Sequence, residues 1–473
     1  MNDAIKQRLR NSGYPDRAEF EWNEFVKNYQ SAFGKELPNT EATLCLASVF
    51  GQSFFLVQHL LKDPQLAERF YYSNFLNKAK PYGRFLDELE AALEPVREER
   101  DGVVKVLRHY RYAETLRMTI RELGGLDDYA TLGSERSALA AACIEATLRY
   151  IRRELIREYG QPYNRDGAVS SFTVLGMGKL GGEDLNYSSD IDLIYFYSDD
   201  EGRFDPSAES ADITHHEYFV RMGEMLNHIL SEKTADGFVF RVDTDLRPEG
   251  KKGTLANSLR AMEIYYESFG SNWERMALTK ARVVGGNQSL GEQFWATVRP
   301  FVYPRATDYE TLDQVRDLKN RIEQSLQHKL SSGIDPKSPG YNVKLGIGGI
   351  RELEFFVGAF QRLYGGQEEA LQERNTLRAL QALVVKKLIS AGDGASLQQA
   401  YCYLRSVENR LQILEDRQTH ALPKSRDDLQ ALARNMFPEE PDGDVSLNKF
   451  HEQLIIHTEN VRQHFAKLFD VSG

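Results

Sequence analysis

Residues 174–197, VLGMGKLGGEDLNYSSDIDLIYFY, constrain the fold of this chain more than any other stretch. A short apolar run ends in a glycine-rich turn, and a second apolar run begins with Asp190 and Asp192. Residues i and i+2 of a strand project from the same face of a sheet, so these carboxylates should share one face. Ile191 and Leu193 should then face the core. Neighbouring carboxylates repel each other unless a cation lies between them, and oxygen ligands suit Mg²⁺ or Mn²⁺.

The plain alternative for this pair is a polar strand face without a ligand. Because the surrounding run is apolar and directly follows a glycine turn, the pattern favours metal binding. A Walker A loop needs serine or threonine after its lysine, but Leu180 follows Lys179. A dinucleotide-type spacing, G-x-G-x-x-G, is present at Gly176, Gly178 and Gly181. Only residues 182–189 separate that turn from the carboxylates, whereas a βαβ crossover needs about a dozen residues.

The nucleotidyltransferase template fits this stretch better. It consists of a glycine turn, a short connection and an Asp-x-Asp pair on a strand, and residues 179–189 separate Gly178 from Asp190. The template usually carries a serine beside the glycine, where this chain has Lys179. Further along, the alternation in FVFRVDTDLRPEG (238–250) predicts a third strand with one apolar and one charged face. Strand pairing should bring Asp243 beside the first two carboxylates.

The periodicity of the chain predicts an α+β fold, in which a mixed, nucleotidyltransferase-like sheet is flanked by helical regions on both sequence sides. The predicted regions are a helical region at 1–167, a catalytic domain at 168–300 and a helical bundle at 301–473. The predicted strands are 172–175, 190–197 and 238–246; the clearest predicted helices are 217–230 and 350–364; the predicted polar loops are 198–212 and 331–342.

Composition excludes several classes of function. The net charge of −11 argues against nonspecific nucleic-acid binding, because phosphate contacts need a basic face. The three cysteines are few and widely spaced, so they indicate neither a disulfide framework nor a zinc site, and they fit a reducing compartment. The sequence shows no signal peptide and no membrane-length apolar run. A cytoplasmic protein without a membrane partner is therefore expected.

The stretch GMGKLGGEDLNYSSDIDLIYFY resembles the signature of the glutamine synthetase adenylyltransferase/adenylyl-removing family. Residues 238–248, 271–285 and 343–355 also resemble elements of that family. Asp243 matches the aspartate of its VDxRLRP element, whereas Asp245 stands where an arginine is common. The family has two nucleotidyltransferase halves, and this chain carries one signature. The long helical region before that signature resembles the N-terminal, adenylyl-removing half.

The resemblance implies removal of AMP from a tyrosine of adenylylated glutamine synthetase by orthophosphate, giving ADP. Asp190, Asp192 and Asp243 would hold two divalent ions, Mg²⁺ or Mn²⁺, and a PII signal protein would be a partner. The candidates for binding nucleotide or orthophosphate are Gly176, Gly178, Lys179, Ser189, Arg247, Lys280 and Arg282. For Arg247 the alternative is a salt bridge within the strand, and for Lys280 and Arg282 it is an exposed charged helix face.

Three other functions remain open at this point, because residue chemistry does not fix the direction of the reaction. The chain could be the adenylyl-attaching half or a stand-alone transferase. It could also be a non-catalytic module that binds glutamine synthetase or a PII protein through its helical regions. The three intact aspartates argue against a decayed centre.

Overall fold

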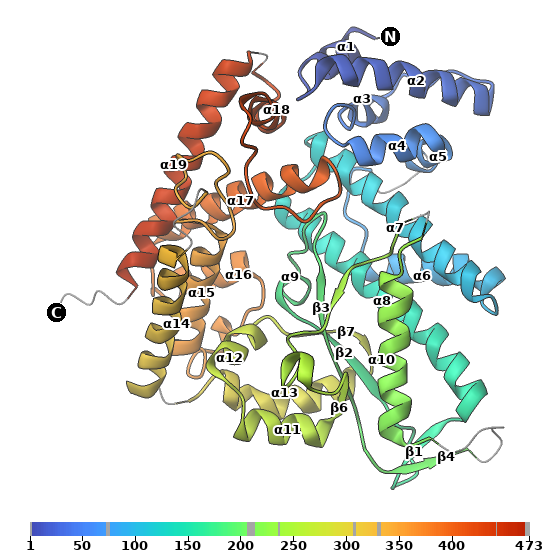
Figure 1. The fold of residues 1–473 in the computed structure, drawn as a ribbon, viewed down its shortest axis with the longest axis vertical. Coiled ribbons are helices and arrows are strands. Elements are labelled where there is room, and N and C mark those ends of the chain that lie inside the picture. The colour runs from blue at the N-terminus through green and yellow to red at the C-terminus, as the bar shows by residue number, and fades with distance from the viewer. Residues whose placement is uncertain are drawn as a thin grey trace.

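The computed structural model describes residues 2–71, 76–205, 213–234, 237–305, 309–328, 333–440 and 442–468. Parts of both predicted polar loops, residues 206–212 and 331–332, lie outside the described residues. Figure 1 shows a central sheet with the N-terminal helices, in blue and cyan, and the C-terminal helices, in orange and red, beside it. The predicted α+β architecture is confirmed.

The described residues up to 159 form helices joined by turns and loops, as predicted. Its helices are α1 (Asp3–Arg10), α2 (Pro15–Phe33), α3 (Glu41–Ala47), α4 (Phe54–Lys62), α5 (Gln65–Tyr71), α6 (Tyr82–Leu93), the 3-10 turn η1 (Glu94–Val96), α7 (Arg100–Leu123) and α8 (Tyr129–Tyr159). One apolar face of α8 is buried, since Ile144, Ile151 and Leu155 are fully covered. Gly160, with φ 88°, ends that helix.

The central sheet is mixed. Its strands are β2 (Phe172–Gly176), β3 (Ile191–Tyr197), β5 (Val242–Asp243), β6 (Ala256–Ser258) and β7 (Arg282–Gly286). β2 pairs antiparallel with β3 on one side and with β7 on the other, whereas β5 and β6 both pair parallel with β3. β1 (Pro162–Asn164) and β4 (Gly202–Phe204) form a separate antiparallel pair.

Five helices accompany these strands, and both faces of the sheet are covered. They are α9 (Gly178–Gly181), α10 (His215–Ser231), α11 (Leu259–Ser268), α12 (Asn272–Leu278) and α13 (Gln288–Val302); the turn η2 spans Gly250–Lys252. α10 contains the predicted helix 217–230. It begins at a capping box in which the side chains of Thr214 and Glu217 bond reciprocally to the backbone.

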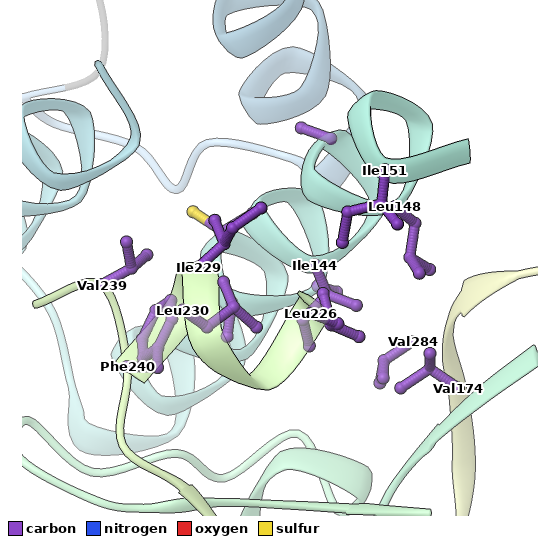
Figure 2. Close-up of a cluster of buried hydrophobic side chains, with 14 of the residues drawn as sticks. Ile144, Leu148, Ile151, Val174, Leu226, Ile229, Leu230, Val239, Phe240 and Val284 are labelled. Atoms are coloured by element: carbon purple, nitrogen blue, oxygen red, sulfur yellow. The ribbon is translucent and has the colours of Figure 1, made fainter. Parts of the chain in front are cut away.

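The alternation of β3 decides which layer each side chain enters. Ile191, Leu193 and Tyr195 join the core formed with α8 and α10, whereas Ile194 and Phe196 join the core formed with α11 and α13. Figure 2 shows the first core, where side chains of α8 and α10 lie beside those of two sheet strands: Ile144, Leu148, Ile151, Leu226, Ile229, Leu230, Val174 and Val284. By the same alternation, Asp192 faces the second layer.

The predicted third strand is too long. Only Val242 and Asp243 form β5, because the chain turns where the Asp243 carboxylate accepts the backbone N–H of Asp245 at 2.7 Å. The predicted alternation also fails before the strand, since Val239 and Phe240 are both buried. β6 and β7 were not predicted.

The C-terminal region is helical. Its elements are α14 (Tyr309–His328), α15 (Ile350–Tyr364), the turn η3 (Glu369–Leu371), α16 (Thr376–Val385), α17 (Ala391–Ile413), α18 (Arg426–Met436) and α19 (Gly443–Lys467). The prediction of a helix at 350–364 is confirmed. In the part of the chain that the structure describes, every helix is too short or too polar to cross a membrane.

Candidate active site

Asp192 and Asp243 lie directly beside each other. They are register partners in the parallel pair of β3 and β5, so their side chains leave the sheet on the same face. Asp190 stands just before β3. All three line one pocket with a volume of about 710 Å³, which is bordered by the sheet, α12 and the C-terminal helices. Strand pairing therefore joins residues that are about fifty positions apart in the sequence, as predicted from the pattern.

The two paired carboxylates, Asp192 and Asp243, repel each other when both are ionised. Burial, and then the neighbouring charge of Asp243, raise the pKa of Asp192 to about 6. Asp190 is in a different situation, because its Oδ1 accepts a hydrogen bond from Nε of Arg241 at 2.6 Å. Arg241 also donates to the backbone carbonyl of Ser188. The charge of Asp190 is therefore balanced by Arg241. A cation bound between Asp192 and Asp243 would relieve the repulsion between these two carboxylates.

The predicted cluster of three carboxylates is thus only partly assembled. Among the described residues, no group of three or more His, Cys, Asp and Glu side chains is placed so that it could hold a metal ion. The adjacent pair of Asp192 and Asp243 fits a divalent cation chemically, since it offers oxygen ligands whose mutual repulsion a cation would relieve. Asp190 would have to exchange Arg241 for the ion.

The glycine turn lies against Asp192. Gly178 has φ +52°, and a Cβ at this position would be 2.9 Å from Oδ2 of Asp192. Glycine therefore both permits the backbone conformation and leaves space for the carboxylate. Gly181 serves a close approach of a different kind, since a Cβ there would collide with the backbone carbonyl of Lys280 at 1.7 Å. Gly176 lies within β2 and packs against Val284 of β7.

Two of the predicted phosphate-binding cations reach the pocket, and both are paired. Nζ of Lys179 lies 3.0 Å from Oε1 of Glu408 in α17, and burial lowers the pKa of this lysine to about 8. Nζ of Lys280 lies 2.8 Å from Oε1 of Glu354 in α15 and also contacts Thr376 at 3.1 Å. Gly178 and Ser189 line the same pocket.

The two predicted arginines have other positions. Arg247 donates to the backbone carbonyls of Thr244, Gly253 and Thr254, so it holds its own loop together. Arg282 donates to the backbone carbonyl of Leu180. Neither arginine lines the pocket that the described residues form. Both therefore support the backbone around the site.

Helix α17 holds the segment that leads to Asp190. Asn186 donates to Glu408 at 2.5 Å, and the backbone N–H groups of Tyr187 and Ser188 donate to the next polar residues of the helix. These α17 side chains are fully buried and follow one helical face: Arg405, Glu408, Asn409 and Gln412. Buried polar groups at spacings of three and four residues in YLRSVENRLQ are a signal from which this role could have been predicted.

The pair of Lys280 and Glu354 predicts a dependence of stability on pH. Burial opposes ionisation of Glu354, but the charges of Lys280 and then Arg405 prevail and lower its pKa from 4.5 to about 2. Because the folded pKa is below the unfolded one, this stabilisation is complete above about pH 4.5 and is lost as the pH falls toward 2. It contributes at most about 3 kcal/mol.

We therefore expect Lys280→Met to lower the free energy of unfolding near pH 7. The difference in this free energy between wild type and variant should become smaller as the pH falls below 4.5. Urea unfolding at a series of pH values measures this difference. Arg299→Gln is the control, because Arg299 pairs at 2.8 Å with the exposed carboxylate of Glu369. A difference in free energy of unfolding between wild type and Lys280→Met that stays constant from pH 7 to pH 3 would contradict the expectation.

Comparison with known proteins places this chain in a family. Residues 44–297 match the family model described as glutamate-ammonia ligase adenylyltransferase, and residues 316–469 match the model described as GlnD PII-uridylyltransferase. A bifunctional glutamine synthetase adenylyltransferase/adenylyl-removing enzyme from Hahella chejuensis is 36% identical over 94% of this chain and 44% of its own length. The enzyme of the same name from Nitrosococcus oceani is 37% identical over 98% of this chain and 45% of its own length.

A third such enzyme, from Xanthomonas campestris pv. campestris, is 40% identical over 76% of this chain and 37% of its own length. The chain thus spans less than half the length of these relatives. The family match covers the glycine turn, all three aspartates and every strand of the central sheet. The chain belongs to the glutamate-ammonia ligase adenylyltransferase family.

Proposed function

We propose that this chain removes AMP from an adenylylated tyrosine of glutamine synthetase by phosphorolysis, giving ADP. The observation that carries the proposal is the pairing of Asp192 and Asp243 against the glycine turn, at the wall of a pocket large enough for a nucleotide. The substrate comes from the names of the relatives, which cover both attachment and removal of the adenylyl group. The direction rests on the helical region before the signature, which resembles the adenylyl-removing half.

The proposed reaction is a displacement at phosphorus. An oxygen of orthophosphate attacks the α-phosphorus, the bond from phosphorus to the tyrosine oxygen breaks, and the phenolate leaves and takes up a proton. Because a phenol has a pKa of about 10, its phenolate leaves without a strong general acid. Orthophosphate is already an anion, so it attacks without a strong base. The chain must therefore mainly orient the reactants and balance their charge.

The described residues divide these tasks. Asp192 and Asp243 would hold a divalent cation, Mg²⁺ or Mn²⁺, and Asp190 would join them if Arg241 released it. When bound, such an ion neutralises charge on the phosphate oxygens. Lys179 and Lys280 lie at the pocket wall with their positions fixed by Glu408 and Glu354.

The nucleotide product separates this reaction from its rivals. We expect the protein to release ADP from adenylylated glutamine synthetase, with release requiring orthophosphate and Mg²⁺ and stopping when the metal is chelated. Hydrolysis would give AMP instead. The attaching reaction in reverse would need pyrophosphate and give ATP. Chromatography of the released nucleotide measures all three. ATP formation that strictly requires pyrophosphate would reverse the assigned direction.

A regulatory partner is the second part of the proposal. The match of residues 316–469 to a family model named for PII uridylylation supports a PII signal protein as the partner of the C-terminal helices. The same product assay should therefore be run with and without PII protein. If no nucleotide were released even with PII present, the binding-module function would be favoured over catalysis.

A further inference from the structure

The C-terminal part of the pocket wall carries three cations that form no ion pair with a carboxylate of the described residues. Lys179 and Lys280, in the same pocket, each lie at ion-pair distance from a glutamate. By contrast, Arg321, Lys344 and Arg351 line the pocket without an ion pair to any carboxylate of the described residues. Uncompensated cations that face a cavity are a chemical signature of anion binding.

The three cations form one connected patch, which we call the cationic wall. Nη2 of Arg351 donates to the hydroxyl of Ser325 at 3.0 Å, and Ser325 lies one helical turn after Arg321 in α14. The backbone N–H of Arg351 donates to the carbonyl of Lys344 at 3.0 Å. In addition, Nε of Arg351 is buried and has no hydrogen-bond partner among the described residues. A buried donor without an acceptor costs free energy, so a ligand oxygen that accepted a hydrogen bond from this nitrogen would remove that cost.

The cationic wall and the carboxylates line the same pocket. Arg321, Lys344 and Arg351 border it together with Asp192 and Asp243. The pocket therefore combines a carboxylate pair that is suited to bind a cation with a cationic wall that is suited to bind an anion. That combination is complementary to a metal-bound phosphate group, in which one ligand carries both charges.

We propose that Arg321, Lys344 and Arg351 bind a phosphate group in this pocket. The proposal rests on the proposed function in one respect, since the phosphate would be either the attacking orthophosphate, which becomes the β-phosphate of ADP, or the α-phosphate of the adenylyl group. A guanidinium offers a planar pair of donors to phosphate oxygens, and a lysine adds a compact charge. Lys179 and Lys280, which the sequence pattern favoured for this role, already have carboxylate partners.

The test measures binding rather than turnover. Titration calorimetry with orthophosphate, and separately with ADP, is carried out in Mg²⁺ on wild type, Lys344→Met and Arg351→Met. Each substitution removes the charge but keeps most of the side-chain volume. We expect at least about tenfold weaker binding of one or both ligands for each variant, because a charge-assisted hydrogen bond is lost. Arg351→Lys keeps the charge and should recover part of the loss.

A matched control lies on the same helix as Arg321. Arg316 pairs with Asp313 at 3.1 Å and does not line the pocket, so Arg316→Gln should leave both affinities within about twofold of wild type. Melting temperatures verify that each variant folds. If Lys344→Met does not fold, Arg351→Met decides the question.

The ligand that is lost identifies the phosphate. Weaker binding of orthophosphate places the attacking group, the later β-phosphate of ADP, at the cationic wall. Weaker binding of ADP with unchanged affinity for orthophosphate places the α-phosphate there. Unchanged affinity for both ligands in folded Lys344→Met and Arg351→Met would overturn the proposal. The proposed function fails separately: a protein that binds these ligands through the cationic wall but releases no ADP from adenylylated glutamine synthetase retains the phosphate site and loses the assigned reaction.

Discussion

Replacement of Asp192 by asparagine is expected to abolish nearly all nucleotide release while making the metal-free protein more stable. The amide keeps the shape of the side chain beside Gly178, but it removes half of the charge that Asp192 and Asp243 offer to a cation. Loss of such a stabilising charge lowers turnover by at least about a hundredfold. The carboxylate is also buried beside a like charge, so its removal should raise the free energy of unfolding by up to about 3 kcal/mol.

The two effects have opposite signs, which makes the variant informative. A residue needed only for the fold would lose activity and stability together. Urea unfolding without metal and ADP release with Mg²⁺ measure them separately. Asp245→Asn is the matched control, because Asp245 pairs with the exposed Lys251 at 3.2 Å and lies outside the pocket lining. Wild-type turnover in Asp192→Asn would exclude the proposed role of this carboxylate.

The segment from β2 to β3 could be predicted because its signals are local. The alternation in residues 191–197 determines which side chains enter each core. Glycine is required at 178 because φ is positive there and because the carboxylate of Asp192 lies close by. The length of β5 could not be predicted in the same way. The side chain of Asp243 bonds to the backbone two residues later and turns the chain, so strand-like alternation continues in the sequence beyond the strand.

The cations of the site show the other limit of prediction from sequence. Lys179 and Lys280 stand in family-like motifs, but their partners, Glu408 and Glu354, come from helices far along the chain. Whether a lysine is available to a ligand depends on such long-range pairs, which no local pattern records. Lys344 and Arg351 form no ion pair with a described carboxylate, and their place at the pocket becomes apparent only when α15 and the segment before it lie beside the sheet.

Glu408 is expected to show the largest effect on stability of any single residue near the site. Burial alone would raise the pKa of its carboxyl group, but the charges of Arg405 and Lys179 hold that pKa well below its usual range. Oε2 of Glu408 lies 2.6 Å from Nη1 of Arg405, and Oε1 lies 3.0 Å from Nζ of Lys179. In Glu408→Gln the buried Lys179 loses its ion-pair partner, and Arg405 keeps only Asp184, whose Oδ2 lies 3.4 Å from its Nη2. Such a loss typically costs about 3–5 kcal/mol.

The same variant should also slow the reaction, although Glu408 is not proposed to touch the reacting atoms. Glu408 accepts a hydrogen bond from Asn186, and α17 holds the backbone of Tyr187 and Ser188 just before the carboxylates. Loosening this segment should shift Asp190 and lower kcat more than it changes KM for orthophosphate. Rates are measured at a temperature where the variant remains folded. A purely structural role would leave kcat per folded molecule unchanged.

A second substitution tests whether buried charge is the cause. Lys179→Met removes the cation whose ion-pair partner Glu408→Gln takes away, so the double variant should be more stable than the sum of the single effects predicts. Glu415→Gln is the matched control, since Glu415 pairs at 2.9 Å with the exposed Arg417 and such surface pairs contribute about 0–1 kcal/mol. If the effects of Lys179→Met and Glu408→Gln were strictly additive, the two side chains would not be coupled. The loss of stability would then have to arise from the other partners of Glu408, which are Arg405, Asn186 and His420.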